Sequence, residues 1–382
     1  MSVFNIIPDL VNYTTRAPVF INNLASTINT IALDTTKKIV QSIQNYFDIW
    51  AGLDASAREL SAFHFERYPD SEWIDLHSNN LIEITIPERS NLRMLNASNN
   101  QLERVTLPEI AKLQDLNVAN NQLPEITLPE YSSLQRLNAS DNELTEITIH
   151  EGSNLRVLNV ANNELEHITI PKYSSLQTID LSSNFLTELI LPDHVVPDET
   201  DLRVVRAFHN HLNRITIPES SNLQELHVGL NFLTEINLPE DCPSLVCLDL
   251  SENQLPKLDI PEGSNLQHLD LFENQLTKLT IPKDSRLQSL NLSENPLINL
   301  DMPEHYSSLS FLSLVDTPLT QLPDSILSLR RDARVYTGNN SFPEGYVQEF
   351  AEKIKQHRET HPGEGPVLLG DDPESGEPIA FT

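Results

Sequence analysis

The sequence predicts a solenoid of short stacked turns, with parallel strands on one face and extended segments on the other. Two observations predict it: an Asn that recurs at a nearly fixed interval, and an apolar frame around each copy. The spacing between these Asn residues is 21 five times, then 26, 21, 22, 21 and 21. A unit of this length buries its apolar side only against its neighbours, so it is stable as an array. The recurring residues are Asn79, Asn100, Asn121, Asn142, Asn163, Asn184, Asn210, Asn231, Asn253, Asn274 and Asn295.

The frame around each Asn reads L-x-x-L-x-L-x-x-N-x-L. One copy contains Leu92, Leu95, Ala97, Asn100 and Leu102. Two further turns with drift follow the last of these copies. This frame is the leucine-rich-repeat signature. It predicts an α/β solenoid, a horseshoe of about 12–13 mostly 21-residue repeats with a parallel sheet on its concave side.

The sequence predicts a different local structure for each half of a turn. The L-x-L step is expected to be a short strand whose alternate residues enter the core. The Asn amide should be buried and bonded to backbone groups of its own and adjacent turns, because an unpaired buried amide costs several kcal/mol. The second half of most turns ends in a motif such as ITIP. Proline fixes φ and the β-branched residues disfavour helix, so this convex side should be extended.

The ends of the array need caps, and the sequence suggests a helix for each. Trp50, Leu53, Ala57, Leu60 and Phe63 follow the 3/4 spacing of one helical face. Such a helix would cover the exposed side of the first turn. The expected organisation is an N-terminal segment that fits a secretion signal (1–45), a helical N-cap (46–70), the repeats (71–342), a C-terminal capping helix (343–360) and a disordered acidic tail (361–382).

The composition of the chain disfavours some classes of binding partner. The chain has 382 residues, 55 acidic against 25 basic ones, and a formal net charge of −30. That balance disfavours nucleic acid and anionic membrane, which require basic surfaces. No apolar run is long enough to span a bilayer. Cys242 and Cys247 are the only cysteines, so we expect a reducing compartment.

Two groups of residues were considered as a catalytic site and as a metal site. Cys247 and His268, with Asp270 or Asp249, could form a thiol nucleophile with a base, but on a smooth surface without a predicted pocket. His209, His227 and Asp249 come from three turns without a dedicated metal-ligand spacing. No phosphate-binding glycine loop occurs. We therefore predict a protein that is not an enzyme and has no catalytic residue, metal site or cofactor.

Two flanking segments carry a family resemblance. The stretch FDIWAGLDASARE at 47–59, the closing stretch LPDSILSLRRDARVYTGNNSF at 322–342 and the short proline-bearing turns resemble the leucine-rich-repeat effectors of type III secretion systems. The resemblance covers about residues 46–357. It implies a secreted virulence protein that binds a host protein in the host cytoplasm. The ITIP motifs differ from the doubled LP pattern of that family. After residue 357 only 25 residues remain and none is Cys, so the E3 ubiquitin ligase domain of some members is not expected.

The outward strand residues form the expected binding surface. In the early turns these positions are mostly Asn, and variety begins at Arg206. Exposed aromatic and Arg side chains are typical interface anchors. The alternative is that Arg206 merely pairs with Asp180 or Asp249 and that Phe208 covers a neighbouring stem. The predicted partner-binding residues are Arg203, Arg206, Phe208, His209, Glu225, His227, Leu230, Asp249 and Phe272.

Two other functions stay open at this point. The chain could be a scaffold that remains in the bacterial cytoplasm. It could also be the substrate-recognition part of a ubiquitin ligase whose catalytic domain belongs to another chain. The edges of the solenoid also permit self-association.

Overall fold

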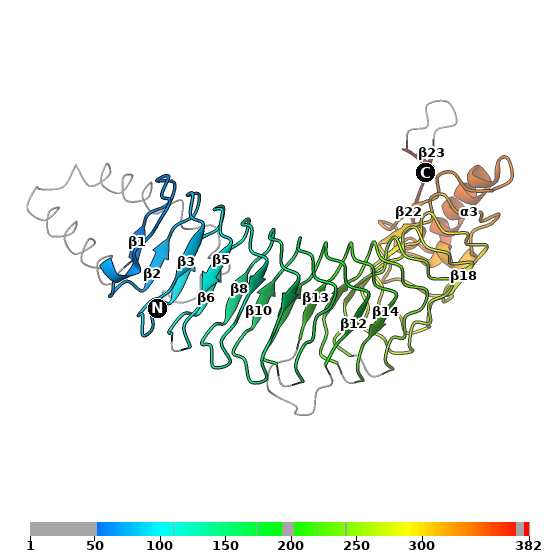
Figure 1. Ribbon diagram of the computed structural model, residues 1–382. Helices are drawn as coiled ribbons and strands as arrows, with labels where there is room; N and C mark the ends of the chain where they lie inside the picture. The colour runs from blue at the N-terminus through cyan, green and yellow to red at the C-terminus, as the bar shows by residue number, and fades with distance from the viewer. Residues whose placement is uncertain are drawn as a thin grey trace, which may run out of the picture.

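The structure is a computed structural model that describes residues 52–109, 111–172, 174–192, 202–219, 221–240, 243–371 and 378–381. Over these residues the chain forms a curved solenoid, with β1 at one end and α3 at the other (Figure 1). The predicted fold of short parallel turns is confirmed. The expected secretion segment 1–45 lies outside the described residues, as do residues 193–201 of the one turn with a spacing of 26.

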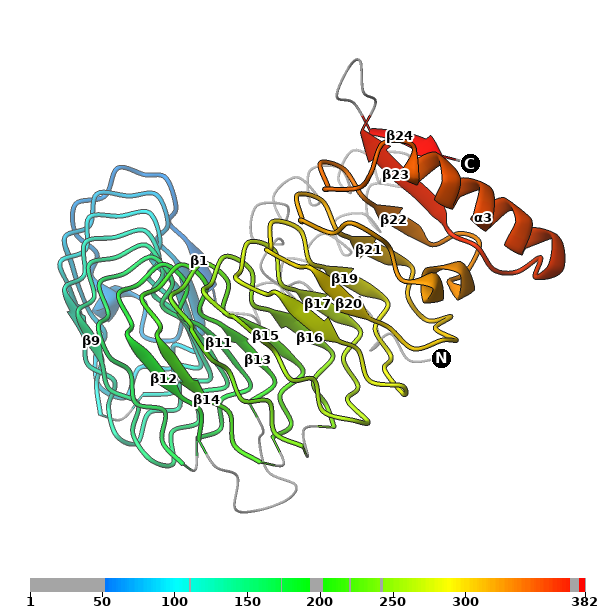
Figure 2. The same cartoon turned by 90° about the vertical axis from the view of Figure 1, so that its right-hand side faces the viewer.

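A single large sheet runs along the solenoid (Figure 2). Most of its strands are three residues long, with a buried middle residue such as Leu95 between two more exposed ones. Leu95 lies beside Leu116 of the next turn, so the buried residues stack in register. In order, the strands are β1 (Gly52–Asp54), β2 (Trp73–Asp75), β4 (Met94–Asn96), β6 (Asp115–Asn117), β8 (Arg136–Asn138), β10 (Val157–Asn159), β11 (Thr178–Asp180), β13 (Val204–Arg206), β15 (Glu225–His227), β16 (Cys247–Asp249), β17 (His268–Asp270), β19 (Ser289–Asn291), β21 (Phe311–Ser313), β22 (Arg334–Tyr336), β23 (Val367–Asp371) and β24 (Pro378–Phe381).

The recurring Asn residues form a buried ladder that joins the turns. Asn121 donates from Nδ2 to the carbonyl of Val118 in its own turn at 2.9 Å and to that of Ala97 in the preceding turn at 3.1 Å. Its Oδ1 accepts the backbone N–H of Leu102 at 2.9 Å. Equivalent bonds recur along the array, so the predicted structural role of the ladder is confirmed.

The opposite side of the turns is extended, as the proline-bearing motifs predicted. Short strands there pair in parallel across neighbouring turns. Alternate side chains, such as Ile84 in the strand Glu83–Thr85, enter the core. The strands are β3 (Glu83–Thr85), β5 (Arg104–Thr106), β7 (Glu125–Ile126), β9 (Glu146–Ile147), β12 (Glu188–Ile190), β14 (Arg214–Thr216), β18 (Lys278–Thr280) and β20 (Asn299–Asp301).

The prediction of a helical N-cap over 46–70 is wrong for its described part. Gly52–Asp54 forms β1, which pairs with β2, and only the short 3-10 helix η2 (Phe65–Arg67) follows. The segment is a degenerate turn in which Arg58 takes the place of the ladder Asn and donates its backbone N–H to Asn79 Oδ1 at 3.0 Å. The helical spacing misled because Leu53 and Leu60 occupy positions shared by both patterns. Gly52 is required here, because a Cβ would lie 1.8 Å from the Trp73 ring.

At the other end, helix α3 (Tyr346–Thr360) lies within the segment expected to be helical and buries Phe350 and Ile354. A second 3-10 helix, η3 (Asp324–Ser328), precedes β22. The tail was expected to be disordered, and over its described residues this is wrong. Val367–Asp371 forms β23, which pairs with β22 and buries Leu368 completely. The average composition of the tail hid the apolar run at 367–369.

The part of the chain that the structure describes has no helix that is long and apolar enough to cross a membrane.

Candidate functional site

The outward residue at the end of each sheet strand has a structural task in most turns. Its side-chain oxygen accepts the backbone N–H two residues later, as when Asp180 Oδ1 accepts from Ser182 at 3.0 Å. Every turn from β2 to β19 has Asp or Asn at this position, except the turns of β13 and β15. There the residues are Arg206 and His227, and Arg has no acceptor atom. The bonds of the other turns come from Asp75, Asn96, Asn117, Asn138, Asn159, Asp180, Asp249, Asp270 and Asn291.

Arg206 and His227 belong to a chain of charged side chains across three strands, which we call the sheet-face cluster (Arg206, Glu225, His227 and Asp249). Register places Arg206 beside His227 and His227 beside Asp249. Arg206 Nη2 lies 3.4 Å from Glu225 Oε2, and His227 Nε2 lies 3.6 Å from the same oxygen. His227 Nδ1 lies 3.8 Å from Asp249 Oδ2. Arg206 thus pairs with Glu225 rather than with Asp180 or Asp249.

The charged groups of the sheet-face cluster shift one another's pKa values. The carboxylate of Asp249 raises the pKa of His227 above its ordinary value, against the opposing effect of partial burial. Burial alone would raise the pKa of Asp249, but bonds from His227 and Ser251 outweigh it and lower that pKa. Burial raises the pKa of the neighbouring Asp270, and the charge of Asp249 adds to the rise. The cluster therefore favours a protonated His227 between two carboxylates.

The remaining predicted residues surround this cluster without contributing to its ion pairs. The side chain of Arg203 is exposed, and 46% of Phe208 is exposed next to β13. Phe272 is half-buried, and its N–H donates to Asp270 Oδ1 at 2.9 Å. His209 Nδ1 lies 3.3 Å from Ser183 Oγ. The suggested grouping of His209 with His227 and Asp249 is thus only partly observed, since contacts join just the latter two.

The residue before each ladder Asn has left-handed backbone, with φ between 50° and 57° in every turn from β2 to β22. This region favours Asn and Asp over residues with larger side chains. The first six turns follow that preference with Ser, Asn or Asp. From β13 on the position changes to His209, Leu230 and then three Glu residues, and among these Leu230 is the one large apolar side chain. Leu230 is also 38% exposed. The turn of β15 therefore departs from the structural consensus at two independent positions, His227 and Leu230.

A third departure forms an exposed aromatic row, which we call the aromatic edge (Phe185, His211 and Phe232). These residues directly follow the ladder Asn in three successive turns. Ring centroids are 5.6 Å apart between Phe185 and His211, and 5.7 Å apart between His211 and Phe232. The two Phe side chains are 47% and 49% exposed. Neighbouring aromatic side chains exposed to solvent are suited to burial against a partner.

Sequence reasoning missed the aromatic edge because it followed only the columns of the strands. The signal was present one residue after each ladder Asn. That position is Asn, Gln or Glu in the five turns before Phe185, and Gln again in the two turns after Phe232. Aromatic residues interrupt this polar run at the turn of β11 and at the next two turns, where the strand columns also change.

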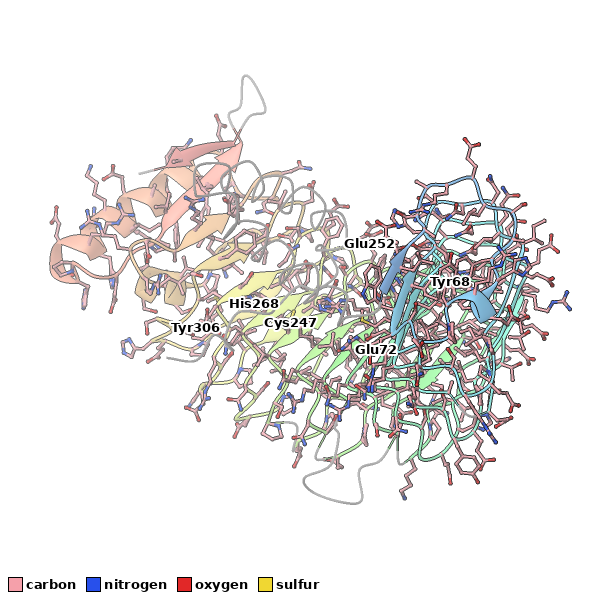
Figure 3. All side chains as sticks on the ribbon, turned by 90° about the vertical axis from the view of Figure 1, so that its left-hand side faces the viewer. Tyr68, Glu72, Cys247, Glu252, His268 and Tyr306 are labelled. Atoms are coloured by element: carbon pink, nitrogen blue, oxygen red, sulfur yellow. The ribbon has the colours of Figure 1, made fainter. Side chains whose placement is uncertain are left out.

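The thiol of Cys247, which was considered as a nucleophile, lies beside His268 as expected, but its surroundings do not activate it. Cys247 and His268 lie side by side on β16 and β17 (Figure 3). Burial raises the pKa of Cys247, and the carboxylates of Glu225, Asp249 and Asp270 raise it further. A nucleophilic thiol requires the opposite shift, because the thiolate is the reactive form. Cys242, the other cysteine, lies outside the described residues.

Comparison with known proteins agrees with this architecture. A family model described as Leucine Rich Repeat matches residues 91–113 and 175–194. No curated protein matches the chain. Among solved structures, YopM from Yersinia enterocolitica is similar, with 27% identity over 80% of this chain and a TM-score of 0.56. The match covers 62% of the YopM chain, so this chain spans about three fifths of that length.

Two more distant structures share the fold. The functional domain of InlJ from Listeria monocytogenes has 20% identity and a TM-score of 0.57, covering 78% of this chain and 70% of that one. The APL1 leucine-rich repeat domain has 21% identity and a TM-score of 0.58, covering 76% and 79%. The protein is therefore a leucine-rich-repeat solenoid, a fold that typically serves as a non-enzymatic scaffold for protein interactions.

Proposed function

We propose that the protein binds a partner protein through the sheet-face cluster and the aromatic edge. Both features lie on the turns of β11, β13, β15 and β16. Together they offer exposed aromatic rings beside an Arg, residue types that are enriched at interfaces. The net charge of −30 favours a partner with a basic contact surface.

The observation that carries this proposal is the triple departure from the structural consensus. The turns of β13 and β15 lack the strand-end Asp or Asn, and the turn of β15 also places Leu230 in a disfavoured backbone region. Side chains that cost stability are common where function needs them. The aromatic edge covers these two turns and the preceding turn of β11.

We further propose that the protein is a secreted bacterial effector that acts in a host cytoplasm. The similarity to a Yersinia protein and the two flanking segments support this assignment. The low cysteine content fits a reducing host compartment.

The test restores the consensus of the other turns rather than damaging the surface. Arg206→Asn supplies an acceptor for the N–H of Phe208, and Phe232→Gln supplies the polar residue of the neighbouring turns. The double variant should fold with at least the stability of the native chain. We expect it to lose a eukaryotic protein that the native chain captures from lysate. Site-specific photo-crosslinking from position 208 should identify the same protein.

The matched control is Tyr131→Ser. Tyr131 is 79% exposed but lies on an early turn outside the proposed surface. This variant should capture the partner as well as the native chain does. Equal capture by the consensus-restoring variant, with no crosslink from position 208, would place binding elsewhere and refute the proposed surface.

A further inference from the structure

Three side chains with metal-binding atoms converge where α3 ends. His357 lies in the last turn of α3, His361 is the residue after the helix, and Glu364 follows in the next loop. The two imidazole rings lie nearly parallel, with centroids 4.3 Å apart and an interplanar angle of 9°. His357 Nε2 is 2.8 Å from Glu364 Oε2. One potential ligand atom from each residue lies within 4.8 Å of the other two.

The backbone holds this group in place without an ion. The N–H of Glu364 donates to the carbonyl of His361 at 3.0 Å, and the N–H of Gly365 donates to that of Leu329 at 2.8 Å. Arg358 Nε donates to the carbonyl of Gly365 at 3.1 Å. The loop that carries Glu364 is therefore tied to α3 on one side and to the segment before β22 on the other. Such pre-organisation reduces the entropy that ion binding must overcome.

We propose that His357, His361 and Glu364 bind a zinc-type divalent cation, with water completing the coordination. Two imidazoles and one carboxylate are a common zinc ligand set, and histidines four residues apart can reach the same ion. Tetrahedral zinc with ligands at 2.0–2.1 Å places the ligand atoms about 3.3 Å apart. Small side-chain rotations convert the observed spacing to this one, because His361 is exposed and the other two are half-buried.

The role of the ion is to clip the C-terminal cap together. In zinc peptidases of the H-E-x-x-H type, a Glu directly after the first His is the general base. Here that position is Arg358, which is bonded to backbone carbonyls. The site instead links α3 to the loop before β23. The final turns of a solenoid have neighbours on one side only, so a cross-link there strengthens the end that opens most easily.

Calorimetric titration of the full chain with Zn²⁺ tests the site directly. We expect one tight ion per chain. His361→Ala and Glu364→Gln should each weaken binding about 100-fold, since even residues that only orient a ligand contribute 10–100-fold. His167→Ala, which removes an exposed histidine of a central turn, should bind as the native chain does. Absence of a tight site, or equal affinity in all three variants, would overturn the proposal.

Hydrogen exchange provides an independent readout of the clip. Zinc at 100 times its dissociation constant should slow the opening of α3 about 100-fold, because the opened cap lacks the site. The Glu364→Gln variant retains the His357 and His361 rings, yet it should lose this protection. Unchanged exchange of α3 in the native chain with saturating zinc would rule out a role as a clip.

Discussion

Leu230 shows the conflict between stability and surface chemistry at the level of one residue. It adopts φ 57° at a position where the early turns have Ser, Asn or Asp. A left-handed residue with a large side chain costs roughly 1–2 kcal/mol. We expect Leu230→Asn to raise the free energy of unfolding by about 1 kcal/mol. Chemical denaturation of the two proteins measures this difference.

The reverse exchange is the control for that prediction. Asn162 has φ 55° at the equivalent position of an early turn. Asn162→Leu should therefore destabilise the chain by a similar amount. If Leu230→Asn destabilises as well, the leucine contributes packing that outweighs its backbone cost, and the argument from backbone preference fails.

His227 makes the sheet-face cluster sensitive to pH. Its folded pKa is raised above the ordinary value, so protonation stabilises the folded state. This contribution is fully present below the ordinary pKa of about 6.5 and is lost as pH rises through the folded pKa. The melting temperature of the native chain relative to His227→Gln should therefore fall across this window.

The ring signals of His227 provide the direct measurement by NMR titration. Asp249→Asn should lower the pKa of His227 because it removes the carboxylate that raises it. A pKa at or below the ordinary value in the native chain would contradict the proposed arrangement of the cluster.

At the scale of elements, the repeats and the helix at 346–360 could be predicted closely, whereas the N-terminal cap and strand β23 could not. A turn repeats its ladder Asn and its apolar frame about a dozen times, so single departures do not hide the pattern. The N-terminal cap occurs once. Its residues Leu53 and Leu60 fit a helix and a solenoid turn equally, and only pairing with β2 decides between them. Strand β23 was missed because its pairing with β22 is a tertiary contact that tail composition does not encode.

The candidate site was predictable to the extent that it lies on strands. The members of the sheet-face cluster were found because side chains alternate along a strand and neighbouring strands stack in register. The specific pairing of Arg206 with Glu225 was not, because it depends on side-chain conformation. The grouping of His357, His361 and Glu364 also required the path of the loop after α3.

Helix α3 gives a prediction about cap stability. Phe350 is 1% exposed, and its ring stacks at 6.0 Å from that of Tyr346. Phe350→Ala should cost about 3–5 kcal/mol of local stability, because a large core side chain is removed. Hydrogen exchange should accelerate in α3 and β23 and stay unchanged at β8 and β10, since each turn contacts only its neighbours. Acceleration throughout the array would instead show that the solenoid opens as one cooperative unit.

At the scale of the molecule, charge is distributed in rows. Glu252, Glu273, Glu294 and Asp316 occupy equivalent positions of successive turns, and all are exposed. Stacked turns hold such residues about 5 Å apart, so their carboxylates repel one another. We expect the melting temperature to rise with salt, which screens this repulsion. Glu273→Gln should raise the melting temperature in low salt and reduce its dependence on salt.

The comparison variant for this effect is Glu151→Gln, which removes one exposed carboxylate from the convex side of an early turn. Its salt dependence should match that of the native chain more closely. A melting temperature that falls with salt would mean that attractive pairs, such as Arg104 with Glu83, outweigh the repulsion.

The ladder of buried amides also makes each turn an interchangeable unit of length. Asn121 offers the same bonds to the turn before it that Asn142 offers to Asn121's own turn. Removing or duplicating one 21-residue unit among the early turns therefore leaves the ladder bonds at every junction intact, although side-chain pairs such as Arg136 with Asp115 would change. The distance from the N-terminal end to the aromatic edge changes by one strand spacing, about 4.8 Å, at each such step. The number of early turns thus sets the distance between the N-terminal end and the aromatic edge, and turns can be added or deleted without changing the residues of that edge.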